Sequence, residues 1–465
     1  MTNLKSFIIF ILSPLILIFI YNITGIPENI FFFITNLLII IFSFIGMFNN
    51  QSQTYSLFKM VFIFIFIFFG IIPLINEVSG NVIYGQFAAD GAFIRGENEF
   101  DINDKIEANL IILFGILFFI FGGRFKINFF DRLLNYLPEI KKLNYFSYIF
   151  FLFLSFLILY KWNFDLNSLL YRGVSDNIER QAIYTSGVDY QLFGRVIRPM
   201  LIMLLVIFIY DYDKKKQYLS YNQKLNRLVT FIFLTSLAVF LTFPLGLERS
   251  QVAIFYIPLL IVFTKFWEKP FMMQSTLLAA IFIIFPFLDK FRRFNGFENF
   301  NFKIDYVYLK QGHFDGYQNF VRVLELDLIT SGRQLLGALL FFVPRSFWET
   351  KPIGSGTFLS EILSLEYYNI AMPFIGEGYI NFGIVGSILF MFLFGILLGN
   401  LDRVVWKLKR SNESHIFIFY YYFLFGWVFL IMRGDLINAF AVLVGFSAAF
   451  WLLVLFLNFL SRIRI

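Results

Sequence analysis

A few basic side chains and one glutamate stand where they could bind phosphate and move a proton. Arg345 and Lys351 belong to the stretch PRSFWETKP at 344–352, and Glu377 belongs to GEGYINFGIVG at 376–386. Arginine binds phosphate through a bidentate fork and stays charged at any relevant pH. A carboxylate can accept a proton from an attacking hydroxyl when its pKa suits the task. We therefore take Glu377 as the leading candidate for a general base and the two cations as candidate phosphate ligands.

Other side chains could complete such a site. Arg249 lies in the turn GLERS at 246–250 and is taken as catalytic with Arg345 and Glu377. The further substrate-binding candidates, beside Lys351, are Arg195, Arg198, Tyr379, Asn381 and Arg433. Arg249 and Arg433 have an alternative role, because an arginine in a short turn can snorkel to a membrane interface or pair with Glu248 or Asp435. Glu377 could instead stabilise the N-terminus of a helix through the helix dipole. Asn381 could instead form a hydrogen bond between helices.

Composition excludes several other chemistries. The chain has no cysteine and only two histidines, so Cys-ligated metals, thiolate nucleophiles and His-rich sites are ruled out. No acidic pair has obvious metal spacing, and we expect metal-independent chemistry without a cofactor. The pair Asp211 and Asp213 resembles a nucleotide-sugar metal motif, but a solvated helix end explains it better. The basic clusters act as topology determinants, so nucleic-acid binding has no support.

The elements that must carry these residues are transmembrane helices. Hydrophobic residues make up 59% of the 465 residues and charged residues only 15%, which a soluble domain would not show. About 20 apolar residues are needed to cross a bilayer. Twelve stretches qualify: 6–22, 30–48, 57–76, 108–123, 143–160, 191–210, 228–246, 250–266, 271–288, 377–399, 416–432 and 436–460. We predict an all-α, polytopic integral membrane protein that forms one membrane domain over residues 1–465.

Charge placement predicts the orientation. Basic residues concentrate in 124–142, 211–227 and 400–415, whereas 77–107 has seven acidic and two basic residues. The positive-inside rule then puts both termini in the cytoplasm. No cytoplasmic segment is long enough for a catalytic domain, and no Walker-type loop is present.

The long segment 289–376, predicted to be external, is expected to contain short helices. In 320–329, Val321, Leu324 and Leu328 share one face, which suits a helix on the membrane surface or against the bundle. The apolar run 335–343 is too short to span and predicts a re-entrant or buried helix. In the next span, Gly383, Gly386, Gly395 and Gly399 suit close helix packing.

These motifs together resemble the family of Wzy-type oligosaccharide repeat-unit polymerases, the O-antigen and capsule polymerases. The resemblance rests on GLERS, PRSFWETKP with the Arg345-to-Gly356 spacing, and GEGYINFGIVG, in this order along a chain with twelve predicted spans. By motif it covers about residues 245–400.

The resemblance implies glycan polymerisation at the outer leaflet of a bacterial inner membrane, on undecaprenyl-diphosphate-linked repeat units. Membrane lipid and a chain-length regulator protein are further partners that it suggests. Two alternatives stay open. An O-antigen ligase would use an external histidine, for which His313 is available, and a lipid-linked oligosaccharide flippase also has about twelve spans. The long external segment favours an enzyme over a flippase, whose loops are usually short.

Overall fold

The computed structural model describes residues 28–48, 53–79, 100–134, 145–165, 169–170, 193–286, 309, 312–365, 368, 370–411 and 415–462. The described part is helical and contains no strand. Among the described residues, seven segments are long and apolar enough to cross a membrane, by length and composition: Asn29–Phe48, Leu57–Val78, Ile102–Gly122, Phe193–Tyr218, Tyr221–Leu241, Phe374–Arg410 and Leu436–Leu460. The chain is therefore an all-helical protein with the helices of a membrane protein.

The described helices agree with most of the predicted spans. Eleven of the twelve predicted spans coincide with a helix, and the first, 6–22, lies outside the described residues. Four of the eleven correspond to shorter apolar helices of 10–17 residues: Tyr145–Lys161, Ser250–Thr264, Met272–Ile284 and Phe417–Arg433. The count of twelve spans thus stays a prediction, whereas the helical class is confirmed.

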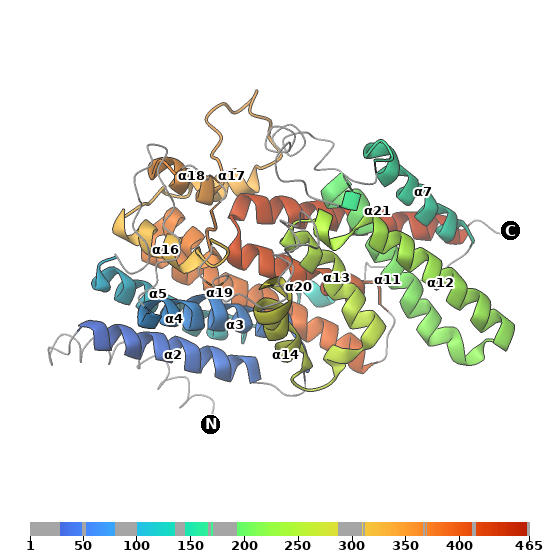
Figure 1. Cartoon of the computed structure of the whole chain (residues 1–465), viewed down its shortest axis with the longest axis horizontal. Helices are drawn as coiled ribbons and strands as arrows, with labels where there is room; N and C mark the ends of the chain where they lie inside the picture. Colours follow the sequence, from blue (N-terminus) through green and yellow to red (C-terminus); the bar gives the residue numbers. More distant parts are fainter. Residues whose placement is uncertain are drawn as a thin grey trace, which may run out of the picture. The chain divides into compact units, whose positions relative to one another are not determined.

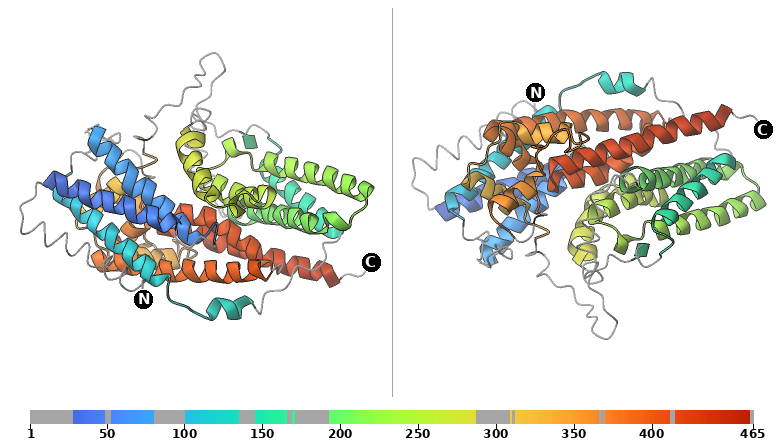
Figure 2. Two further views of the ribbon diagram at one scale, coloured as in Figure 1. Left: turned by 90° about the horizontal axis from the view of Figure 1, so that it is seen from below. Right: turned by 90° about the horizontal axis from the view of Figure 1, so that it is seen from above.

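The chain divides into two compact units, and each is described by itself. The first comprises Met1–Ile127, Asp305–Arg403 and Val428–Ala441. Its helices are α2 (Glu28–Phe48), α3 (Leu57–Ile65), α4 (Ile72–Ser79), α5 (Ile102–Gly122), α16 (Gly316–Glu325), α17 (Arg333–Leu339), α18 (Ser355–Ile362) and most of α19 (Phe374–Arg410). A π-helical turn, Phe66–Ile71, joins α3 to α4. In this unit α2 lies beside α3 and α5 (Figure 2), and α16 packs against α5.

The second unit comprises Asn128–Ile304, Val404–Trp427 and Val442–Ile465. It contains α6 (Phe129–Leu134), α7 (Tyr145–Lys161), α11 (Arg198–Lys215), α12 (Tyr221–Leu241), α13 (Arg249–Thr264) and α14 (Met272–Ala279). Most of α20 (Phe417–Arg433) and of α21 (Leu436–Arg462) also belongs to it. Within the unit, α11 packs against α7, α12 and α13 (Figure 1). Every residue of α11 from Arg198 to Ile209 is buried, so α11 is its central helix.

Glycines on α19 allow close packing, as their spacing predicts. A Cβ on Gly395 would lie 2.1 Å from the carbonyl oxygen of Phe119, and one on Gly399 would lie 2.8 Å from Gly123. Small residues at such positions let two helix backbones approach closely. The predicted packing role is confirmed for this pair, and the partner is α5.

Segments that are predicted to share the cytoplasmic side are bonded to one another within each unit. In the first unit, Asp402 accepts hydrogen bonds from the backbone N–H groups of Leu57 and Phe58, at 2.9 and 3.0 Å. In the same unit the backbone N–H of Ile127 donates to Asn400 at 2.8 Å. These contacts join the start of α3, the end of α5 and α19.

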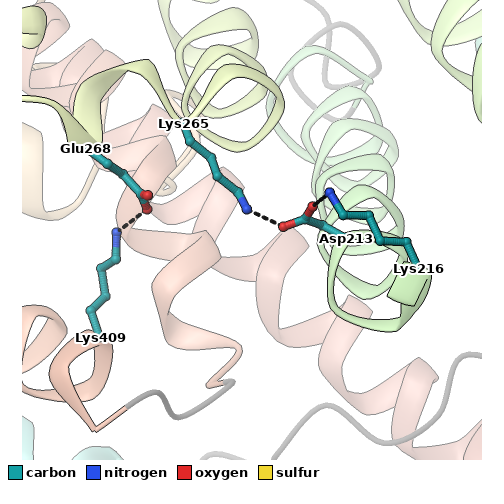
Figure 3. Close-up of polar contacts among 5 residues, drawn as sticks. All are labelled: Asp213, Lys216, Lys265, Glu268 and Lys409. Carbon is teal, nitrogen blue, oxygen red and sulfur yellow. Dashed lines mark hydrogen bonds and ion pairs between the residues drawn. The ribbon is translucent and has the colours of Figure 1, made fainter. Parts of the chain in front are cut away.

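Ion pairs make the same kind of connection in the second unit. Figure 3 shows Asp213, at the end of α11, between Lys216 (2.7 Å) and Lys265, and Glu268 paired with Lys409 at 3.0 Å. Because Asp213 is engaged by lysines, it fits the expected helix end rather than a metal site. Asp211 is likewise paired with a lysine, in the next turn of the helix.

Two predictions for the segment between α14 and α19 hold in part. The helix α16 does not lie on a surface: Gly316–Leu324 are all buried, and Leu328 lies beyond its end. Its polar residues are inside because they bond to one another and to the chain before α19. The run 335–343 forms α17 followed by turns, and its apolar side chains are not all buried, since Leu336, Leu339 and Phe342 are exposed. With only seven residues, α17 is too short to bury side chains on all of its faces.

Candidate functional site

The GEGYINFGIVG stretch forms a sharp bend inside α19. Phe382 and Gly383 leave the helical conformation, and Gly383 has φ +64° and ψ −153°. This combination is open essentially only to glycine. The two arms of the bend then touch: Gly378 lies against Gly386, and Ser387 donates to the carbonyl of Ile375 at 2.8 Å. Gly383 thus makes the bend, whereas Gly386 has the predicted packing role.

The bend leaves backbone carbonyls without helical partners, and the chain before α17 satisfies them. The backbone N–H of Thr330 donates to the carbonyl of Ile380 at 2.6 Å, and that of Gly332 donates to Asn381 at 2.9 Å. The side chain of Asn381 accepts from the backbone N–H of Leu335 at 2.7 Å and donates to the carbonyl of Glu377 at 2.8 Å. Asn381 therefore anchors the start of α17 to the bend.

Glu377, one helical turn before Asn381, anchors two other elements. Its side chain is completely buried. One carboxylate oxygen accepts from the Ser355 hydroxyl at 2.7 Å, and the other accepts from the backbone N–H of Leu436 at 2.8 Å. Glu377 therefore joins the first residue of α18 and the first residue of α21 to α19. Both of its oxygens are occupied by protein donors.

A basic loop, residues 340–354, connects α17 to α18 between these two anchors. In it the exposed guanidinium of Arg345 donates to the carbonyl of Lys351 at 2.8 Å. The Lys351 ammonium donates to the carbonyls of Phe341 and Val343 at 2.5 and 3.0 Å. Desolvation, followed by the nearby charge of Arg345, lowers the pKa of Lys351. The structure thus brings together two cations that the sequence motif singled out.

Asp315 holds the segment that leads into α19, at Ala371, by a hydrogen bond. It is buried, and its Oδ2 accepts from Asn319 at 3.0 Å and from the backbone N–H of Ala371 at 3.3 Å. Asn319 also donates to the carbonyl of Ala371 at 2.8 Å. Burial raises the pKa of Asp315, and the charges of Arg433 and Arg322 oppose that rise. The charge of Arg433 thus acts on a buried carboxylate that the sequence did not suggest as its partner.

The sequence analysis missed several of these residues. Asp315, Asn319 and Arg322 are spaced to share one helix face, and this pattern could have indicated a buried polar side. Arg322 is buried near the ring of Phe100, and burial lowers its pKa to about 10. Ser355 lies in a stretch that was noted, but no local signal indicates that it would bond to Glu377. The histidine considered for a ligase, His313, is half-buried just before α16.

Tyr379 is buried, and its hydroxyl donates to Asp327 at 3.1 Å, so it joins the bend to the turn after α16. The other predicted arginines belong to the second unit. Arg198 is buried and stacks 4.2 Å from the centre of the Trp162 ring, and Arg195 packs against Gly445. Arg249 is the first residue of α13, and its side chain lies outside the described residues.

The described residues hold no group of three histidine, cysteine or acidic side chains that could bind a metal ion. Comparison with family models, with curated proteins and with solved structures finds no match to this chain. The argument for a function therefore rests on its own residues and their geometry.

Proposed function

We propose that the chain polymerises undecaprenyl-diphosphate-linked oligosaccharide repeat units into a surface polysaccharide, an O-antigen or a capsule. The reaction takes place at the outer face of a bacterial plasma membrane, with about twelve spans, both termini in the cytoplasm and residues 289–376 outside. One observation carries the proposal. Arg345 and Lys351 lie in one exposed loop and are joined by a hydrogen bond, and the helices on either side of the loop are bonded to Asn381 and Glu377 of α19. The two motifs that resemble the polymerases are thereby parts of one structure.

The bonds among predicted cytoplasmic segments support the topology. In each unit they join segments to which the charge pattern gives the same side, such as 124–142 with 400–415 through Asp131 and Lys407. An arrangement with these segments on opposite sides would not allow such contacts.

The reaction develops negative charge on the leaving diphosphate, and this charge must be stabilised. The hydroxyl of the acceptor sugar attacks the anomeric carbon of the growing glycan, the bond to the phosphate oxygen breaks, and undecaprenyl diphosphate leaves. The hydroxyl proton passes to a base. Preorganised cations beside the leaving diphosphate lower the barrier, and each contact is typically worth about 2.7–4 kcal/mol. In our account Arg345 and Lys351 supply these contacts.

The base is less well supported than the cations. The sequence proposes Glu377, but the two hydrogen bonds to its carboxylate favour an anchoring role. As an anchor it would act through Ser355 and Leu436, by holding the loop in place. Arg249, Arg195 and Arg198 stay candidates from sequence alone.

The test uses cells that lack the gene and express variants of it. Arg345→Ala should abolish long glycan chains while single capped repeats persist, and Arg345→Lys should restore them partly, because the fork geometry is lost. A full ladder from well-expressed Arg345→Ala would overturn the assignment. Loss of the single-repeat band together with the ladder would indicate a ligase or a flippase instead.

A further inference from the structure

A third basic residue, Arg333, reaches the same loop from the first turn of α17. Its guanidinium donates to the carbonyl of Thr350 at 2.9 Å. Arg345 donates to the carbonyl of the next residue, Lys351, at 2.8 Å. The two arginines therefore converge on consecutive peptide groups from different parts of the chain. Nothing in the sequence around Arg333 indicates that it would bond to this loop.

Both guanidinium groups keep most of their donors for a ligand. Arg333 and Arg345 are exposed, and each uses one nitrogen for its carbonyl, whereas a guanidinium has five N–H donors. Neither is ion-paired with a carboxylate among the described residues. Between 333 and 352 the chain has three basic side chains and one acidic one, Glu349. The local charge is positive and is not neutralised within the loop.

We propose that Arg333 is the second guanidinium arm of one anion site, and that the two arms together select a diphosphate over a monophosphate. The inference rests on the proposed function, which supplies a lipid-linked diphosphate as the ligand. A diphosphate has two phosphoryl groups, so two forks can each engage one of them. A monophosphate has one phosphoryl group, which both forks would have to share. Lys351 donates to the carbonyls of Phe341 and Val343 and so also holds the loop in this form, while its charge and its third N–H donor stay available for the diphosphate.

The experiment measures binding of farnesyl diphosphate and farnesyl monophosphate to the purified full-length protein in detergent. Wild type should prefer the diphosphate, and Arg333→Gln and Arg345→Gln should each weaken its binding by about tenfold or more. Monophosphate binding should change less, so that the preference disappears. Glutamine keeps an N–H donor for the carbonyl of Thr350, which preserves the brace. Arg333→Lys gives a second variant that keeps the charge.

A matched control is Arg410→Gln, which removes an exposed arginine from the last turn of α19, in the other unit. It should bind both compounds as wild type does. If Arg333→Gln keeps the preference while Arg345→Gln loses it, Arg333 only braces the loop and the inference is wrong, but the proposed function stands. If wild type shows no preference and Arg345→Gln binds equally well, the diphosphate site of the proposed function fails as well.

Discussion

Glu377 and Asn381 lie one helical turn apart on α19, and between them they hold α17 and α18, the two helices that flank the basic loop. The side chain of Asn381 accepts a hydrogen bond from the backbone N–H of Leu335 at the start of α17. Glu377 accepts one from the hydroxyl of Ser355 at the start of α18. The loop that joins α17 to α18 carries Arg345 and Lys351. Two polar side chains that the sequence marked as candidates for catalysis and binding thus position two further candidates.

This relationship predicts different results for two variants of Glu377. In Glu377→Gln the amide can accept from Leu436 and donate to the Ser355 oxygen, so the anchor survives and long glycan chains should persist. In Glu377→Ala two buried donors lose their acceptor, at a cost of about 1–3 kcal/mol each, and the chains should be lost. The glycan ladder, with protein level checked by immunoblot, measures both. An inactive but well-expressed Glu377→Gln would restore the role of general base.

The bend in α19 predicts a strong effect at Gly383. Gly383→Ala should lower the stability by about 1–3 kcal/mol, because its backbone conformation is closed to residues with a Cβ. The matched control is Gly312→Ala, since a Cβ there would meet nothing within 4 Å and should change little. Thermal unfolding of the two purified variants tests this. Equal midpoints would mean that the bend does not depend on Gly383.

The buried clamp at Asp315 predicts a pH effect on stability. Burial raises the pKa of Asp315 above the ordinary aspartate value of 3.8. Its favourable contribution is therefore fully present below pH 3.8 and is lost as the pH rises through the raised pKa. Asp315→Asn cannot titrate, so the unfolding midpoint of wild type should fall relative to this variant as the pH increases. A relative rise would show that the attraction to Arg433 outweighs desolvation.

The predicted topology can be tested at two exposed serines. Ser346 lies in the basic loop, and Ser411 follows α19. With a membrane-impermeant thiol reagent on intact cells, Ser346→Cys should be labelled and Ser411→Cys should be labelled only after lysis. Ser355 is unsuitable because it is buried against Glu377. Labelling of Ser411→Cys alone in intact cells would reverse the proposed orientation.

The sequence predicts the helices well, because long apolar stretches have few other options in a membrane. It also predicts the close packing at Gly395 and Gly399, since small residues four apart form a flat face. It does not predict that Glu377 accepts from Ser355 or that Arg333 and Arg345 donate to the carbonyls of two consecutive residues. Those contacts depend on how α17 and α18 fold back onto the bend, and no local sequence pattern predicts this arrangement. The burial of Arg322 was not predicted, because hydrophobic periodicity alone does not reveal a buried polar network.

The central claim is that the purified protein joins lipid-linked repeat units without any other energy source. The measurement is polymer formation from lipid-linked single repeats, extracted from cells that lack the gene, after reconstitution of the protein into vesicles. Wild type should form long chains with no nucleotide sugar and no ATP. Arg345→Ala should be slower by about two to three orders of magnitude. A requirement for nucleotide sugar, or equal polymer from Arg345→Ala, would contradict the account.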